Sequence, residues 1–295
     1  EICACLVGSE MCIRDRETGG ELQSMSGTRE ENKDYLFRDM PVGRAVLALA
    51  APTVISQIIT VIYNMADTFF IGQLNDPDQV AAATVAMPAF VALTALANLF
   101  GIGGASKIAR CLGRGDRETA RRTAAFCIWT AAAAALVYGM VICLVRPWLL
   151  PTLGADGDTY GFCSSYVFWT VTVGAAPTVL NAALAHLIRT EGYARQAGFG
   201  VALGGILNIA LDPVFIFALD MEITGAAVAT MLSNAAAAAY FLLFLYRTRR
   251  ETVITPHPRY YTVSEGIPGE VLAGGLPSFI MTVSYTHLRA HETCA

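Results

Sequence analysis

Charged residues are scarce in this sequence and are nearly absent from its long apolar stretches. Only 15% of the 295 residues are Asp, Glu, Lys or Arg, whereas 55% are hydrophobic, and the mean hydropathy is +0.50. The net charge of −4 reflects acids outside these stretches, nine of which lie between Glu1 and Asp39. A composition this apolar excludes an ordinary soluble domain and indicates a polytopic membrane protein.

Several motifs of soluble function are missing. The eight cysteines form no CxxC pair, so buried small hydrophobes are a better interpretation than disulfides or metal ligands. No basic patch carries interleaved aromatic residues, which argues against nucleic acid as a partner. The Gly-rich stretch from Gly101 lacks the GxxxxGK[ST] spacing of a phosphate-binding loop, so ATP-driven transport has no support. Gly113–Asp116 spells GxGD, but it lies in an Arg-rich loop rather than in a span.

What the sequence does contain is six apolar segments at near-regular spacing. Each is long enough to cross a bilayer as a helix, since about 20 residues suffice. They predict an all-α, polytopic membrane helix bundle. The segments are Ala45–Ile71, Val80–Ser106, Thr123–Val145, Phe162–Ile188, Ala197–Leu219 and Gly225–Tyr246.

The remainder of the chain divides around this bundle. Residues 1–40 are polar and mixed in charge and predict a disordered cytoplasmic lead-in without a cleavable signal peptide. Residues 41–250 form the predicted six-helix lobe and 251–270 a cytoplasmic linker. Residues 271–283 open a seventh helix, and 284–295 form a tail of different character. The opening EICACLVGSEMCIRDR and the closing SYTHLRAHETCA are hypothesised to be non-native, with a native start at Met25 or Met40.

Basic residues give the predicted orientation. They gather in the loops after the second, fourth and sixth segments, whereas the alternate loops hold Arg146 as their single basic residue. Because cytoplasmic loops carry the excess of Lys and Arg, we expect the N-terminus in the cytoplasm. The clustered residues are Lys107, Arg110, Arg114, Arg117, Arg121, Arg122, Arg189, Arg195, Arg247, Arg249 and Arg250.

The predicted seventh segment resembles the first. Aligned on proline, Pro277-Ser278 matches Pro52-Thr53, and the preceding Val-Leu-Ala occurs in both. A repeated entry after six spans is typical of a duplicated transporter, although two apolar helices can also share a few residues by chance. We interpret the chain as one complete half of such a protein and the start of the other.

Two acids inside apolar segments are the candidate functional groups. Asp67 follows Tyr63 by one helical turn, on a helix that Pro52 is expected to kink. Acids in membrane helices are costly and usually face a bundle interior or a wet cavity. Asn208 and Asp212 are four residues apart and share one helix face. Two such carboxylates can bind a hard cation or share a proton, or they can simply hydrogen-bond neighbouring helices.

Other polar residues in the spans are weaker candidates. Thr230 adds a hydroxyl ligand, although membrane threonines more often bond their own helix backbone. Asn181 follows Pro177 and is a candidate for the same cavity, whereas Asn64, Asn98 and Asn234 are expected to pack between helices. The histidines show no metal-ligand spacing.

Four stretches together resemble bacterial multidrug and toxic compound extrusion (MATE) transporters. They are PTVISQIITVIYNMADTFFIGQLND, LGRGDRETARR, IRTEGYAR and LNIALDPVFIF, and the resemblance covers about Leu36 to Ile280. Known members have twelve spans in two lobes and exchange Na⁺ or H⁺ for organic, often cationic, drugs. The resemblance implies that this chain is the N-terminal six-helix lobe and that the second lobe is missing.

The resemblance also implies residue roles. Asp67, Asn208, Asp212 and Thr230 would form the cation or proton site, with the first three as Na⁺ ligands. Gln57, Tyr63 and Asn181 would line the drug cavity, and Pro52 would mark where the first helix bends.

We therefore predict a fragment of a cation-coupled multidrug antiporter of the bacterial inner membrane. It would be no enzyme and would need no cofactor beyond Na⁺ or H⁺. Its partners would be organic drugs, lipid and the missing lobe. Three alternatives remain: a flippase for a lipid-linked glycan, an intramembrane aspartyl protease, and a non-transporting membrane scaffold.

Overall fold

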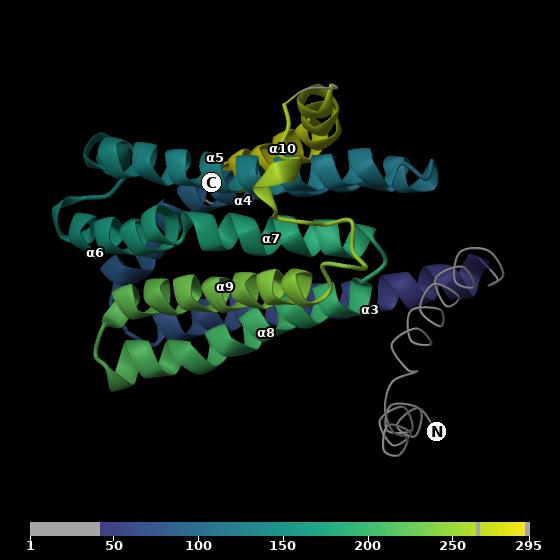
Figure 1. Cartoon of the computed structure of the whole chain (residues 1–295). Coiled ribbons are helices and arrows are strands. Elements are labelled where there is room, and N and C mark those ends of the chain that lie inside the picture. The colour runs from purple at the N-terminus through teal and green to yellow at the C-terminus, as the bar shows by residue number, and fades with distance from the viewer. Residues whose placement is uncertain (1–41, 264–265, 293–295) are drawn as a thin grey trace, which may run out of the picture. The chain divides into compact units, whose positions relative to one another are not determined.

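The computed structural model of the protein describes residues 42–263 and 266–292, and it is helical with no strand in those two ranges. The all-α prediction is confirmed. By its contacts the chain divides into two units at residues 48 and 49, and the second, Leu49–Ala295, is described here. The predicted lead-in, 1–40, lies outside the described residues. The helices (Figure 1) are α3 (Val42–Gly72), α4 (Pro77–Gly113), α5 (Arg117–Thr152), α6 (Gly157–Val167), α7 (Ala175–Thr190), α8 (Ala194–Pro213), α9 (Glu222–Arg247) and α10 (Ile267–Glu292).

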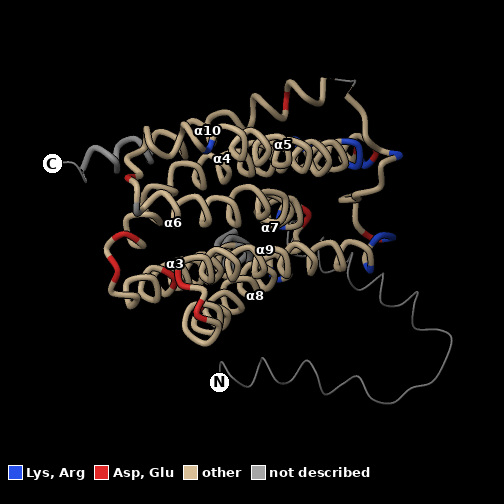
Figure 2. The backbone as a smooth tube through the Cα atoms, turned by 90° about the vertical axis from the view of Figure 1, so that its left-hand side faces the viewer, with Lys and Arg blue, Asp and Glu red and all other residues tan. Residues whose placement is uncertain are grey.

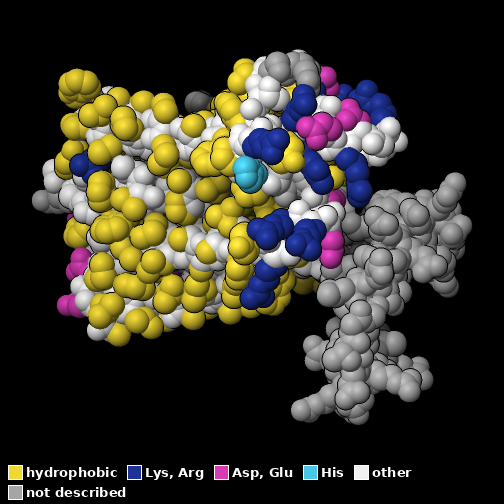
Figure 3. All heavy atoms as spheres, in the orientation of Figure 1, with side chains coloured by type: hydrophobic (Ala, Val, Ile, Leu, Met, Phe, Trp, Pro, Cys, Tyr) yellow, Lys and Arg dark blue, Asp and Glu magenta, His cyan; other side chains and the backbone are white. Residues whose placement is uncertain are grey.

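The predicted membrane spans agree with these helices. Five helical segments in the described part of the chain are long and apolar enough to cross a membrane, and a bent pair makes a sixth. The outer surface seen in Figure 3 is covered with hydrophobic side chains between two more polar ends. Large apolar side chains such as Leu144 and Trp148 are more than 70% exposed. Such a surface is expected to face lipid, because exposed apolar side chains are unfavourable in water but not in the hydrocarbon of a bilayer.

The fourth predicted segment, Phe162–Ile188, is bent rather than straight. A π-helical stretch, Phe168–Val173, separates α6 from α7, and the two parts of the span meet at 51°. A Cβ on Gly174 would lie 2.5 Å from the Thr170 carbonyl oxygen, so the tight bend requires glycine. Pro177 is in the first turn of α7, where no helical N–H bond is lost. Periodicity cannot show such a break because both parts keep an apolar composition.

The helices extend further than predicted, and most of the basic residues assigned to loops lie in helices: Arg117, Arg121, Arg122 and Arg146 in α5, Arg189 in α7, Arg195 in α8 and Arg247 in α9. Lys107 and Arg110 were expected in a loop but belong to α4, and only Arg114–Asp116 separate α4 from α5. Asp116 caps α5 by accepting a hydrogen bond from the Thr119 amide at 3.0 Å. Hydrogen bonds from Thr119 hold the pKa of Asp116 below its ordinary value. The acid of the apparent GxGD motif is therefore a helix cap.

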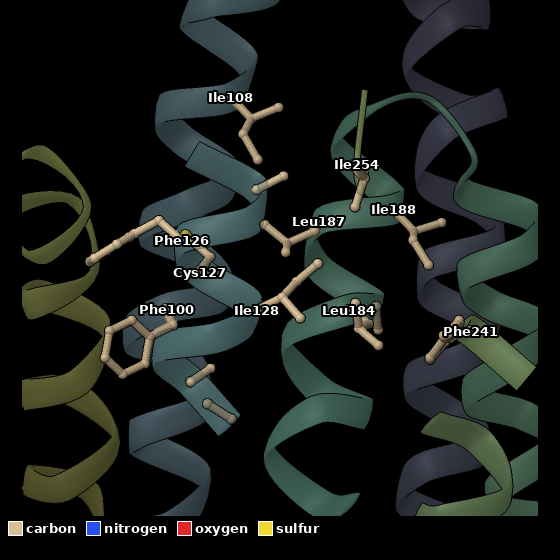
Figure 4. Close-up of a cluster of buried hydrophobic side chains, with 14 of the residues drawn as sticks. Phe100, Ile108, Phe126, Cys127, Ile128, Leu184, Leu187, Ile188, Phe241 and Ile254 are labelled. Atoms are coloured by element: carbon tan, nitrogen blue, oxygen red, sulfur yellow. The ribbon is translucent and has the colours of Figure 1, made fainter. Parts of the chain in front are cut away.

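The core lies between α4, α5, α7 and α9. Figure 4 shows side chains of these helices interdigitating, among them Phe100, Cys127, Leu187 and Phe241. These four residues come from four different helices, so the core holds the bundle together. Small residues line much of it, and alanines on α4, α5 and α9 are fully buried. Close helix approach of this kind is how membrane bundles gain van der Waals contact.

Charges are divided between the two ends of the bundle. Lys and Arg gather at the end where α4 meets α5, α7 meets α8, and α9 ends (Figure 2). The opposite end carries mainly acids, and Arg146 lies in the last two turns of α5. This separation agrees with the loop pattern from which the orientation is predicted.

The segment after α9 is bound to the bundle. The Glu191 carboxylate, in the turn between α7 and α8, accepts a hydrogen bond from the Val253 amide at 3.0 Å. The Trp129 indole of α5 donates to the Pro256 carbonyl at 2.9 Å. Helix α10 then begins at Ile267, four residues before the predicted seventh helix, and continues to Glu292. The native or foreign origin of residues 284–295 stays a prediction.

Candidate functional site

Asn208 and Asp212 meet on one face of α8, as their spacing predicts. The Asn208 amide nitrogen donates to Asp212 Oδ1 at 3.1 Å and to Thr230 Oγ1 of α9 at 3.3 Å. Asp212 is fully buried and Asn208 is 2% exposed. Directly after Asp212, the α-helix ends at Pro213 and continues as a π-helix over Val214–Ala218. The proline has no N–H for the helical ladder, which explains the change of backbone pattern.

Asp67 reaches the same region from α3. A Cβ built on Gly205 of α8 would lie 2.9 Å from the Tyr63 ring, so the two helices are in direct contact there. Further along, the Phe70 and Phe217 rings lie 6.4 Å apart. The Asp67 and Asp212 carboxylates are close enough to interact electrostatically. We call Asp67, Asn208, Asp212 and Thr230 the carboxylate cluster.

Three oxygens of the carboxylate cluster are buried without a hydrogen-bond partner. They are Asp67 Oδ1, Asn208 Oδ1 and Asp212 Oδ2. A buried polar atom without a partner costs about 1–3 kcal/mol, and more when it carries charge. Oxygen donors are also the ligands that hard cations prefer. The cluster is therefore suited to hold a cation, or to hold a proton on a carboxylate.

A chain of amides joins Asn181 to this cluster. The Asn181 side chain on α7 donates to Asn234 Oδ1 on α9 at 2.8 Å. Asn234 in turn donates to the Thr230 backbone carbonyl at 2.9 Å. The structure thus connects Asn181 to the cluster through one residue that was expected only to pack between helices. Asn181 Oδ1 is itself buried without a partner.

The other predicted residues are placed less specifically. Gln57 is exposed on α3, and Tyr63 is half-buried beside α8. Pro52 lies within α3, whose backbone is helical on both sides of it. The drug-cavity role of Gln57, Tyr63 and Asn181 and the bending role of Pro52 stay predictions.

Tyr166 of α6 is a candidate that sequence reasoning missed. Its phenol lies within electrostatic range of both Asp67 and Asp212. It stands two residues before the π-helical stretch that bends the span. Nothing in the local sequence distinguishes this tyrosine from others at a membrane interface, because its place near the acids depends on that bend.

An all-α bundle of apolar spans with a buried polar cluster defines a polytopic membrane protein with an internal polar site. The model of the MatE family matches residues 52–214. The chain belongs to this family, whose members are transporters. The family resemblance expected from the sequence is confirmed.

Individual relatives agree with this assignment. The chain is 31% identical over 254 residues to the multidrug export protein MepA of Staphylococcus saprophyticus, covering 84% of this chain and 54% of the relative. A solved outward-facing multidrug resistance MATE family transporter matches with a TM-score of 0.71 at 30% identity, covering 81% of this chain and 52% of that one.

A second structure shows the family in another state. An inward-facing multidrug resistance MATE family transporter matches with a TM-score of 0.69, at 30% identity. It is therefore matched almost as closely as the outward-facing one. This chain spans about half the length of the curated relatives it matches.

Proposed function

We propose that this chain is the N-terminal lobe of a cation-coupled antiporter that exports drugs or toxic organic compounds. The support is family membership together with one observation, the three buried oxygens of the carboxylate cluster that lack a partner. A transporter needs a site whose energy changes when a coupling ion arrives. Two neighbouring carboxylates meet this need because their mutual repulsion is relieved by one Na⁺ or one proton.

The mechanism follows from where the two carboxylates lie. Asp67 is on α3 and Asp212 on α8, so a cation held between them draws oxygens of two helices together. We propose that this rearranges α3 at Pro52 and weakens drug binding in the lobe. Coupling then arises because the cation and the drug favour different arrangements of one helix. No covalent step is involved.

We propose that the protein resides in the bacterial inner membrane with its N-terminus in the cytoplasm. The second lobe would begin with α10 in the full-length transporter. The coupling ion is Na⁺ or H⁺, and no other cofactor is proposed. The substrates would be drugs or toxic organic cations, and the similarity to the multidrug export protein MepA supports the first of these.

The alternatives have less support. A flippase for a lipid-linked glycan would favour a basic internal cavity, whereas the basic residues here gather at one end of the bundle (Figure 2). An aspartyl protease would use the same two acids, but the sequence around Asp212 is Leu-Asp-Pro and the GxGD acid caps a helix. In a membrane scaffold the acids would be packing partners, and no ion would bind them.

Ion-dependent stability tests this proposal without requiring transport. A ligand at 100 times its Kd stabilises the folded state by about 2.7 kcal/mol. We expect Na⁺ at constant ionic strength, or a proton titration, to raise the Tm of the purified full-length transporter. Asp212→Asn should abolish the rise.

Asp220→Asn is the matched control. It makes the same acid-to-amide change on an exposed turn, where the backbone φ of 52° suits asparagine. An ion-dependent rise in Tm that persists in Asp212→Asn would contradict the proposed site.

A further inference from the structure

Lys107 is a buried basic residue that the proposed cation site does not use. Its relative exposure is 3%, and it and Asp212 are the two buried charged residues in the described part of the chain. Unlike Asp212, it has a full partner: Lys107 Nζ lies 3.0 Å from Glu270 Oε1 of α10. Arg110, one turn further along α4, lies 3.5 Å from the other oxygen of the same carboxylate. A buried charge is tolerated because it is paired in this way.

The ion pair lies at the end of an unusually close contact between α4 and α10. A Cβ on Gly103 would overlap the Val271 carbonyl oxygen, and a Cβ on Gly275 would overlap the Leu99 carbonyl oxygen. Leu99, Gly103 and Lys107 are spaced by four and therefore lie on one face of α4. At the far end of the contact, Asn98 donates to Thr282 at 3.3 Å. We call this contact the α4–α10 seam.

The two sides of the seam are far apart in sequence but share one core. Helix α4 is in the core of the lobe, and α10, which follows the bound segment that carries Val253 and Pro256, adds Ile267 and Val271 to that core. In the proposed transporter α10 is the first helix of the second half. The close contacts of the seam are made by glycine backbones and closed at the basic end by Lys107, Arg110 and Glu270, and its separation would expose Val271, which is fully buried there. A buried ion pair adds little net stability but specifies one packing of the two helices. It therefore suits a contact between helices that opens and closes.

We propose that Lys107, Arg110 and Glu270 form a latch that closes the α4–α10 seam at the basic end. This inference rests on the proposed function. Opening the seam at that end would separate Glu270 from both cations and bring Lys107 into water. The latch thus controls access from the side on which the basic residues gather.

The first experiment measures opening of the seam and does not depend on transport. Val271 is fully buried in the seam, so a cysteine at Val271→Cys reacts with maleimide only when the seam opens. The background is the full-length transporter with its other cysteines replaced. We expect Glu270→Gln to speed labelling about tenfold, because Lys107, whose side chain is 4% exposed, is then left buried without its charged partner. Lys107→Met should do the same.

Glu118→Gln is the matched control. It breaks a second ion pair at the basic end, 3.2 Å between Arg122 and Glu118 on the surface of α5, which has no part in the seam. Its labelling rate should equal that of the parent. Equal rates in Glu270→Gln, Lys107→Met and the parent, with folding verified by size-exclusion chromatography, would overturn the latch.

The second experiment locks the seam. A Cβ built on Gly274 lies 3.8 Å from Ser106 Cβ, the typical separation in a disulfide, about 3.8 Å. Oxidation of Ser106→Cys/Gly274→Cys should form a bond that mass spectrometry detects in a non-reducing digest. Drug efflux should be lost on oxidation and restored by reductant. Unchanged efflux in the fully oxidised transporter would show that the seam does not open during transport.

The two proposals fail differently. If the reduced double-cysteine protein and its parent carry no drug, the proposed function is wrong, and the labelling comparison alone decides the latch. If the parent transports while Glu270→Gln labels like Glu118→Gln, the function stands and the latch is wrong.

Discussion

Asp212 and Lys107 show two ways in which this protein buries charge. Lys107 is matched by Glu270 at 3.0 Å. Asp212 receives only the Asn208 amide at one oxygen, while its other oxygen has no partner. Since burial without compensation is costly, the difference supports the proposal that Asp212 binds a cation or a proton reversibly.

Asn208 should set the affinity of the carboxylate cluster. Asn208→Ala removes the donor shared by Asp212 and Thr230 and one of the three free oxygens. A hydrogen bond to a charged group is worth about 1.5–3 kcal/mol, so we expect the apparent affinity for the coupling cation to fall at least tenfold. Titration of Tm or of cation-stimulated efflux measures this change.

Asn64→Ala is the control for that variant because Asn64 is exposed on α3, the helix that carries Asp67. Its cation affinity should match that of the parent. An Asn208→Ala variant with parental affinity would exclude Asn208 from the site.

How far the sequence could predict the site depends on the residue. Asp67, Asn208 and Asp212 are visible because an acid in an apolar span is rare and because a spacing of four shares a helix face. Tyr166 and Asn234 are not visible, since tyrosine and asparagine are common in spans and only the packing of bent helices brings them near the acids. The sequence also cannot show that three oxygens of the carboxylate cluster lack a hydrogen-bond partner, because hydrogen bonding depends on how the helices pack.

At the level of the elements, Gln79 joins the starts of two helices. Its side chain is 3% exposed; it donates to Asp76 Oδ2, the cap of α4, at 3.1 Å and accepts from the Ile223 amide in the first turn of α9 at 3.1 Å. Both helices begin at the acidic end of the bundle, where the Asp220 and Glu222 backbones have positive φ.

Gln79→Leu should therefore destabilise the bundle. The Ile223 N–H would be left buried without an acceptor, which costs about 1–3 kcal/mol. Thermal unfolding in detergent should show a lower Tm than that of Gln73→Leu, the same change at an exposed position of the preceding turn. Equal Tm values for the two variants would contradict the joining role of Gln79.

The elements themselves were largely predictable, and the exceptions have physical causes. The lengths of the apolar segments alone locate six spans, because a helix needs about 20 apolar residues to cross the hydrocarbon of a bilayer. The bend in the fourth span was missed because Gly174 and the π-helical stretch alter the hydrogen bonding without altering the composition. The ends of α4 and α5 were missed because charged residues such as Lys107 and Arg110 extend a membrane helix beyond its apolar part.

At the scale of the whole molecule, the separation of charge predicts how the protein is inserted. A cysteine at Arg114→Cys, in a full-length background without other cysteines, should react with a membrane-impermeant maleimide only from the cytoplasmic side. A cysteine at Asp220→Cys should react only from the opposite side. Labelling of the two positions from one side would contradict the topology, and the reverse pattern would place the N-terminus outside.

The central claim is that a cation held by Asp67 and Asp212 drives drug export. The most direct measurement is drug efflux by the full-length transporter in everted vesicles, with Na⁺ and H⁺ gradients imposed separately. We predict efflux driven by one of these gradients, lost in Asp67→Asn and in Asp212→Asn, and retained in Asp220→Asn. Efflux that proceeds at the parental rate in either acid variant, or that needs neither gradient, would contradict the account.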